Sequence, residues 1–200
     1  ADEKVPQLIW YSDAATHDSK FYERIEFKTD CIYVFDKGYT DFWRFDKWTK
    51  SNIQFCTRLK ENATYESLEE LEIPDGVDEG VLKDEWIKLP LRKNGVIHDY
   101  TRLRRIAYWD QEQNRLIVCL SNIDNMNADE ITDLYKCRWQ IEILFKQLKQ
   151  NFPLKYFLGD NANAITIQIW CTLIVNLLLT VIKEKVKKRA WSFSNIVSFT

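Results

Sequence analysis

The pattern of hydrophobic and polar positions changes twice along the chain. Over the first sixty or so residues, short β-branched and aromatic runs alternate with stretches of helical period. This pattern predicts strands at about 8–12, 31–35 and 53–59, with helices at 18–28 and 39–50. Alternation of strands with helices is typical of an α/β domain.

Residues 60–118 follow a different pattern, in which apolar and polar positions alternate between turn signals. Asn94-Gly95 stands between two such stretches, and this dipeptide is a strong signal for a two-residue β-hairpin loop. We therefore expect a mostly antiparallel β insertion in this part of the chain.

Helical periods return in the last third. Asn127 and Glu130 form a capping-box pattern that predicts a helix start. The apolar run 165–182 is about long enough to span a bilayer, yet it carries a polar residue every fourth position. Those residues are Gln168, Thr172, Asn176 and Thr180. A helix packed against a sheet with one polar edge explains this stripe better than lipid does, so we expect no membrane partner.

The helix that follows Asn127 carries a group of chemically active side chains on one face. At about 100° per residue, they fall within an arc of roughly 80°, beside an apolar stripe. They are Tyr135, Arg138, Glu142, Lys146 and Lys149. A carboxylate is thus held between bases at the edge of a core. Such i,i+4 pairs also line ordinary solvated helices, so this face alone does not decide the function.

A second acidic position lies at the end of an earlier predicted strand. Asp36 follows the apolar run 31–35, which we interpret as a buried strand, and Gly38 marks the turn into the next helix. Reacting groups in α/β sheets collect at the carboxyl ends of strands. A single acid in this place is also a common helix cap, so both interpretations of Asp36 stay open.

Together the two segments resemble one family. The run CIYVFDKGY and the spacing Tyr-x2-Arg-x3-Glu-x6-Lys are similar to the second-aspartate motif and the glutamate signature of bacterial insertion-sequence transposases of the DDE type. The resemblance is to the IS-four group, which includes the Tn-five and Tn-ten enzymes. It extends over nearly the whole chain, through WYSDAATHDSKFYERI, FCTRLKEN, RLIVCLSNIDNMNADEI and YFLGDNANAITIQIW.

The resemblance implies an RNase H-like α/β fold, incomplete at its N-terminus and interrupted by the β insertion. Residues 1–59 would form the first part of the catalytic core and residues 60–114 the insertion. Residues 115–200 would supply the last strand, the glutamate helix and the closing helix.

The resemblance also implies the site. Asp36 and Glu142 would be catalytic ligands of a two-metal Mg²⁺ or Mn²⁺ site, because hard cations take carboxylate oxygens. The first aspartate of the family lies upstream of this chain, so one carboxylate ligand would be missing. Asp13 and Asp18 match a strand end and a helix start instead. The expected DNA-binding residues are Tyr135, Arg138, Trp139, Lys146, Lys149 and Arg58, with Trp139 as a stacking ring.

The implied activity is metal-dependent DNA cleavage and strand transfer at transposon ends. The partners would be transposon-end and target DNA, with a homodimer in the synaptic complex, in the bacterial cytoplasm at the nucleoid. This chain, lacking one ligand, would be inactive by itself. An inactive remnant that serves as a DNA-binding or interaction module is the alternative, and a structure-specific nuclease of the same fold is a third possibility.

Charge and composition fit this picture in part. A net charge of −2 is low for a DNA enzyme, whose affinity comes largely from Lys and Arg. However, residues 61–85 hold ten acids against Lys83 alone, while 135–189 are basic, which suggests a DNA-facing half and an acidic segment turned away from it.

The five cysteines lack CxxC pairing and predict buried free thiols. The two histidines, His17 and His98, are too far apart to predict a zinc site.

Overall fold

The structure, a computed structural model, describes residues 18–152 and 156–185. The described residues divide into two compact units, 18–138 in the first and 139–152 with 156–185 in the second. The predicted strand at about 8–12 lies outside the described residues, as do Asp13 and His17.

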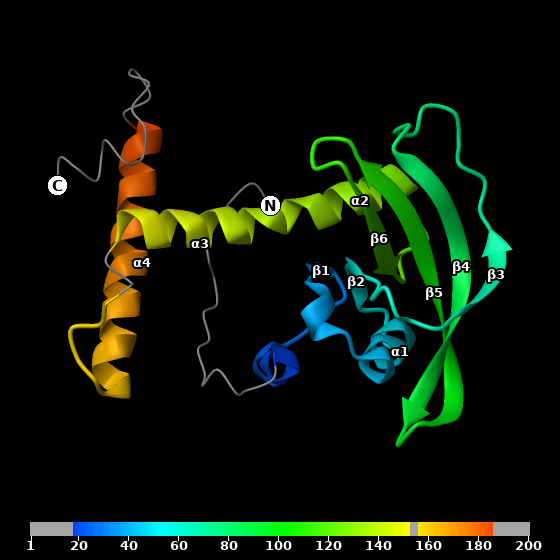
Figure 1. Ribbon diagram of the computed structural model, residues 1–200, viewed down its shortest axis with the longest axis horizontal. Coiled ribbons are helices and arrows are strands. Elements are labelled where there is room, and N and C mark those ends of the chain that lie inside the picture. The colour runs from blue at the N-terminus through cyan, green and yellow to red at the C-terminus, as the bar shows by residue number, and fades with distance from the viewer. Residues whose placement is uncertain (1–17, 153–155, 186–200) are drawn as a thin grey trace. The chain divides into compact units, whose positions relative to one another are not determined.

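The first unit is built on a six-stranded sheet with the order β1-β2-β6-β5-β4-β3 (Figure 1). Its strands are β1 (Ile32–Val34), β2 (Gln54–Arg58), β3 (Glu66–Glu70), β4 (Val81–Lys93), β5 (Val96–Asp110) and β6 (Arg115–Ser121). β1 and β2 run parallel, and every other neighbouring pair is antiparallel. The predicted mixed α/β class is confirmed.

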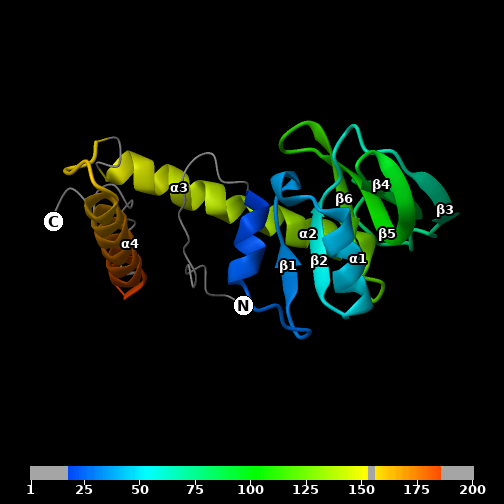
Figure 2. The same cartoon turned by 90° about the horizontal axis from the view of Figure 1, so that it is seen from below.

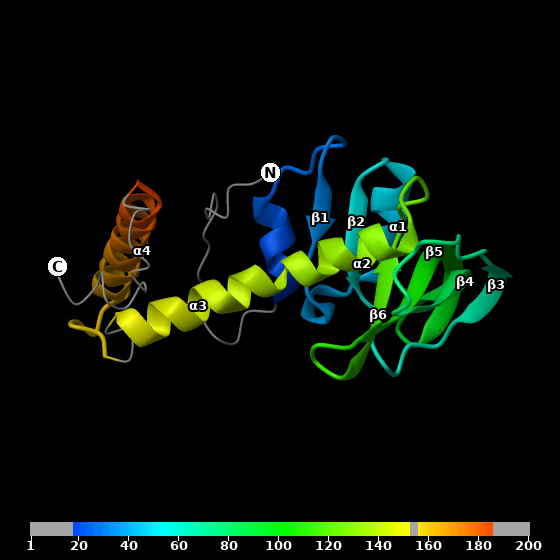
Figure 3. The same cartoon turned by 90° about the horizontal axis from the view of Figure 1, so that it is seen from above.

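Helices cover both faces of this sheet. The first unit contains the short 3₁₀ helices η1 (Asp18–Arg24) and η2 (Lys37–Tyr39) and the α-helices α1 (Phe42–Lys50) and α2 (Ala128–Cys137). Figures 2 and 3, taken from opposite sides, show α1 on one face and α2 on the other. Phe45 and Trp48 of α1 pack on buried residues of β2, β4, β5 and β6. Ile131 and Tyr135 of α2 belong to the core cluster on the opposite face.

Three predicted elements differ from the structure. The helix expected at 18–28 is the 3₁₀ helix η1, which ends at Arg24. Tyr22 and Phe27 both pack on Trp48, with ring centroids 5.0 and 4.6 Å away. Five residues along an α-helix would turn these rings about 140° apart, so the chain leaves the helix between them. The helix expected at 39–50 begins only at Phe42, capped by Asp41. The strand expected to be buried at 31–35 is half-buried, because β1 is an edge strand of the described sheet.

The predicted hairpin is confirmed. Asn94 and Gly95 join β4 to β5 and have φ values of 52° and 79°. A two-residue type I′ turn requires positive φ at both positions, which Asn and Gly tolerate best. The strands of the expected insertion pair with β6 and, through it, with β2, so they continue the same sheet. The boundaries at residues 60 and 114 stay a prediction.

The second unit contains α3 (Trp139–Asn151) and α4 (Ala162–Lys185). The single helix expected after Asn127 is therefore interrupted, because α2 ends at Cys137 and α3 begins at Trp139. The amide of Arg138 bonds to the carbonyl of Tyr135, three residues back, at 3.1 Å. This 3₁₀-type bond tightens the last turn of α2. The capping box of Asn127 and Glu130 is confirmed.

α4 exposes the side that we expected to be packed. The segment Ala162–Lys183 is long and apolar enough to cross a membrane by length and composition, and 17% of its most apolar window is buried. Its polar stripe is turned inward: Thr172 and Asn176 are buried, while Ile174 and Leu178 are more than half exposed. The stripe has internal partners, since the Gln168 amide bonds to backbone groups of Tyr156 and Leu158, both at 2.9 Å. The polar side of α4 is therefore its more buried side, whereas we expected the apolar side to be packed.

The cysteines also differ from expectation in part. All five are free, but only Cys56 and Cys119 are buried, and Cys31, Cys137 and Cys171 are exposed.

Candidate functional site

Asp36 performs the helix-cap role that its sequence position left open, and its two carboxylate oxygens have different partners. It follows β1 and caps η2, where its Oδ1 accepts a hydrogen bond from the amide of Gly38 at 3.3 Å. Its other carboxylate oxygen, Oδ2, lies 3.3 Å from Nη1 of Arg138. The Asp36 side chain remains 41% exposed, so a ligand can approach it. The cap role therefore leaves one carboxylate oxygen for an interaction with the signature segment.

Arg138 joins this aspartate to the signature tyrosine. Its side chain is only 12% exposed, and its guanidinium carbon lies 5.3 Å from the centre of the Tyr135 ring. The structure thus brings together three of the predicted site residues from opposite ends of the first unit's sequence. A guanidinium flanked by a carboxylate and a ring is oriented, because its planar fork and its flat face each have a partner.

Tyr135 is buried at the end of α2. Burial raises the pKa of its hydroxyl, an effect that the charge of Arg138 opposes and that of Asp36 reinforces. The charge of Arg58 also acts on this hydroxyl and favours its ionised form. Because the net direction is upward, Tyr135 is a neutral phenol near neutral pH and can donate a hydrogen bond.

The parallel pairing of β1 and β2 explains how Arg58 reaches the same place. Val34 lies opposite Cys56 in the register, so Asp36 and Arg58 each follow two residues further along parallel strands. The carboxyl ends of parallel strands meet at one edge of a sheet. Asp36, Arg58, Tyr135 and Arg138 form what we call the Asp36 cluster.

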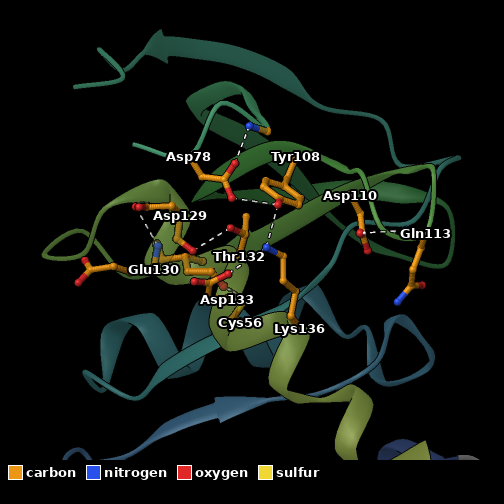
Figure 4. A network of polar contacts seen from close by, with 12 residues as sticks. Cys56, Asp78, Tyr108, Asp110, Gln113, Asp129, Glu130, Thr132, Asp133 and Lys136 are labelled. Atoms are coloured by element: carbon orange, nitrogen blue, oxygen red, sulfur yellow. Dashed lines mark hydrogen bonds and ion pairs between the residues drawn. The ribbon is translucent and has the colours of Figure 1, made fainter. Parts of the chain in front are cut away.

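A polar network fixes α2 to the sheet beside this cluster (Figure 4). The Lys136 ammonium donates to the Tyr108 hydroxyl at 2.8 Å and to Asp133 at 3.0 Å. The Tyr108 hydroxyl in turn donates to Asp78 at 3.1 Å. Although burial opposes it, hydrogen bonding to Tyr108 and Asp133 raises the pKa of Lys136 above its usual value. Lys136 is thus a fixed structural cation, although it adjoins Tyr135 in sequence.

A buried arginine that our sequence analysis missed holds the entry to α2. Arg104 bonds to both carboxylate oxygens of Asp84, at 2.9 and 2.6 Å. It also donates to the carbonyl oxygens of Ile123 and Met126, at 3.2 and 2.7 Å, directly before the α2 cap. No sequence signal singled out Arg104, because its strand also carries Arg102 and Arg105. In the structure its buried guanidinium has the carboxylate partner that burial requires.

The other predicted site residues belong to the second unit. Glu142, Lys146 and Lys149 share one face of α3 and, with Phe145 and Gln150, line a shallow hollow of about 410 Å³. Trp139 begins α3 and is 39% exposed, which leaves its ring accessible. The shared face predicted for Glu142, Lys146 and Lys149 is therefore present within α3.

The donor chemistry of these carboxylates suits a hard cation, but the ligand set is small. Asp36 offers carboxylate oxygens, which Mg²⁺ prefers, and one of them faces the Arg138 guanidinium. Within residues 18–152 and 156–185, no group of three or more His, Cys, Asp or Glu side chains is placed to hold a metal ion.

Comparison with known proteins identifies the family. Residues 4–178 match the family described as the transposase DDE domain. This chain belongs to that family. It is similar to bacterial insertion-sequence transposases, as the signature residues predicted.

Three relatives define the extent of this similarity. A Sinorhizobium fredii protein named as transposase y4zB is 29% identical over 182 residues, covering 90% of this chain and 50% of the relative. A Synechocystis protein named as a transposase for insertion sequence element IS4SA is 30% identical over 166 residues, or 82% of this chain and 45% of the relative. A Geobacillus stearothermophilus protein named as a transposase for element IS5377 is 23% identical over 195 residues, or 98% and 50%. The chain spans about half the length of these curated relatives.

Proposed function

We propose that this DDE transposase chain is part of an enzyme that cuts DNA at transposon ends and transfers the freed strands to a target. The observation that carries the proposal is the ion pair between Asp36 and Arg138, at 3.3 Å. It connects the strand-end aspartate to the signature segment, two motifs that the family resemblance had linked only by sequence. The presence of both Asp36 and Glu142 favours an active enzyme over an inactive remnant.

Asp36 and Glu142 are the proposed ligands of Mg²⁺ or Mn²⁺. Such ions, when bound, supply positive charge that activates the attacking oxygen and stabilises the leaving oxygen. The family resemblance calls for a third carboxylate from a part of the protein outside this chain. The RNase H-like fold, the IS-four subgroup, the bacterial cytoplasmic location and a homodimeric synaptic complex belong to the same proposal.

Arg138 is proposed to exchange its carboxylate partner for a DNA phosphate. A guanidinium fork matches carboxylate and phosphate oxygens with similar geometry, so the exchange preserves the direction of its hydrogen bonds. Tyr135, a neutral phenol, can donate to the same phosphate, and Arg58 adds positive charge nearby. This arrangement would hold the DNA backbone beside the Asp36 carboxylate, which orients the phosphodiester for cleavage.

The bases of α3 are proposed to hold the neighbouring phosphates. Lys146 and Lys149 share a face with Glu142, so a phosphate drawn to them would lie near that carboxylate. The exposed ring of Trp139 can stack on an unpaired base.

Cleavage of DNA by the protein from the complete reading frame tests this proposal. With Mg²⁺ and a duplex carrying the element end, Glu142→Gln should abolish cutting, because the amide cannot act as an anionic metal ligand. Glu112→Gln is the matched control, since Glu112 lies in the exposed turn between β5 and β6 and should cut normally. The 200-residue chain alone should not cut. Normal cutting by Glu142→Gln would contradict the assignment.

A further inference from the structure

The hairpin of β4 and β5 extends beyond the rest of the sheet. β3 pairs with β4 only between Glu85 and Lys88, and β6 pairs with β5 only from Arg104 to Asp110. The ends of β4 and β5 next to the hairpin turn pair only with each other among the described strands. Residues 88–103, here named the arm, contain this two-stranded ribbon, and Lys88 at its base also pairs with Glu66 of β3. The tip of the arm extends past β6 and α1 in Figure 1.

One face of the arm is anchored, which makes the ribbon rigid. Leu89, Leu91 and Leu103 are completely buried on this face, and Leu89 and Leu103 pack in the cluster that contains α1 residues. The Trp43 indole of α1 donates a hydrogen bond to the carbonyl oxygen of Arg92 at 3.0 Å. The opposite face of the arm therefore points in a fixed direction.

That opposite face alternates basic and aromatic side chains. Lys88 lies opposite Arg102 in the register, and Pro90 lies opposite Tyr100. The Lys88 ammonium lies 4.4 Å from the centre of the Tyr100 ring. The Arg102 guanidinium lies 4.5 Å from the centre of the neighbouring Trp86 ring. Tyr100 is 46% exposed, and the side chains of Lys88 and Arg102 are 37% and 56% exposed, so these three groups are accessible at the surface.

The arm is positively charged, most strongly at its tip. It holds four bases, Lys88, Arg92, Lys93 and Arg102, against the single acid Asp99. Lys88 and Arg102 pair with Glu66 and Glu69 of β3, at 3.7 and 2.9 Å, but these pairs are exposed and therefore weak. No described carboxylate lies within ion-pair distance of Arg92 or Lys93, so the charge at the tip is uncompensated.

We propose that the arm is a second binding surface for duplex DNA, distinct from the Asp36 cluster, and that Arg92 and Lys93 contact backbone phosphates. The inference rests on the proposed function, since it takes DNA as the partner. The major groove admits a two-stranded β-ribbon. A chain of net charge −2 must meet DNA through local positive surfaces, and the arm is one of them. Phosphate contacts of this kind carry no sequence information, so the arm supplies affinity and orientation.

Salt-dependent binding of the 200-residue chain to a labelled duplex of mixed sequence tests the arm. The slope of log K against log salt is negative for such binding. The double variant Arg92→Ala, Lys93→Ala should reduce its magnitude by roughly 0.9 for each phosphate that the protein no longer neutralises. Lys28→Ala, Lys60→Ala is the matched control, because it removes two exposed bases elsewhere on the first unit and should leave the slope unchanged. Thermal unfolding followed by circular dichroism checks that all variants are folded.

Arg138→Ala, measured in parallel, separates this inference from the proposed function. A smaller slope magnitude for Arg138→Ala, together with an unchanged slope for the arm variant, would overturn the proposal that the arm binds DNA. The proposed function would still stand. A smaller slope magnitude for the arm variant alone would support the arm and count against phosphate binding by Arg138. Absence of duplex binding by the unmodified chain would overturn both.

Discussion

Arg138 is the residue on which the account of the site depends. Its guanidinium has a carboxylate on one side and an aromatic ring on the other, both from residues predicted as part of the site. The sequence predicted Asp36, Tyr135 and Arg138 separately, because each stands in a recognisable local pattern. It did not predict that Asp36 and Arg138 pair, since periodicity describes one element at a time and contains no information on contacts between distant segments.

Replacing Arg138 should affect both DNA binding and stability, whereas Lys149 should affect binding alone. Each Ala variant should weaken binding to transposon-end DNA by nearly the same factor for every sequence. It should also reduce the magnitude of the slope of log K against log salt by about one. Arg138→Ala should also lower the free energy of unfolding by roughly 0.5–1.5 kcal/mol, because its side chain is largely enclosed. Lys149→Ala should change stability by less than about 0.5 kcal/mol. Binding titrations at several salt concentrations and urea unfolding give both quantities. Unchanged slopes for both variants would make these residues ordinary structural and surface charges.

At the level of elements, short-range signals were reliable and the packing of long helices was not. The capping box at Asn127 and the Asn94-Gly95 turn formed as predicted, since each depends on backbone angles set by adjacent residues. The break at Arg138 and the inward polar stripe of α4 were not foreseen. The hydrophobic pattern alone indicates neither a local change of hydrogen-bonding type within a helix nor which face of a mostly apolar helix is packed.

The Arg104–Asp84 pair is the element-level feature with the largest expected effect. Arg104→Met should destabilise the fold by about 3–5 kcal/mol, because it leaves the buried Asp84 carboxylate without its cation. The double variant Arg104→Met, Asp84→Asn should be less destabilised than the sum of the single changes, because the unpaired charge is gone. Urea unfolding of the four proteins measures this coupling. Additive effects would show that the pair does not hold the entry to α2.

For the whole molecule, the sequence predicted the family and the sign asymmetry of the chain. The acid-rich segment contains β3, which forms the sheet edge opposite β1 and thus lies away from Asp36. Local patterns could not predict the long arm. Its alternating residues are those of any strand, and only the strand pairing shows that β3 and β6 end before the hairpin does. The chain spans about half the length of each of these curated relatives.

The proposal that Asp36 and Glu142 are ligands of one divalent ion is tested most directly by a double-mutant cycle on Mn²⁺ binding. Free Mn²⁺ can be followed by electron paramagnetic resonance as it is added to the 200-residue chain and to Asp36→Asn, Glu142→Gln and the double variant. If the ion is shared, each single change should remove most of the weak binding, and the double change should weaken it little further. Independent, additive effects, or weaker binding in only one of the two single variants, would contradict a shared site.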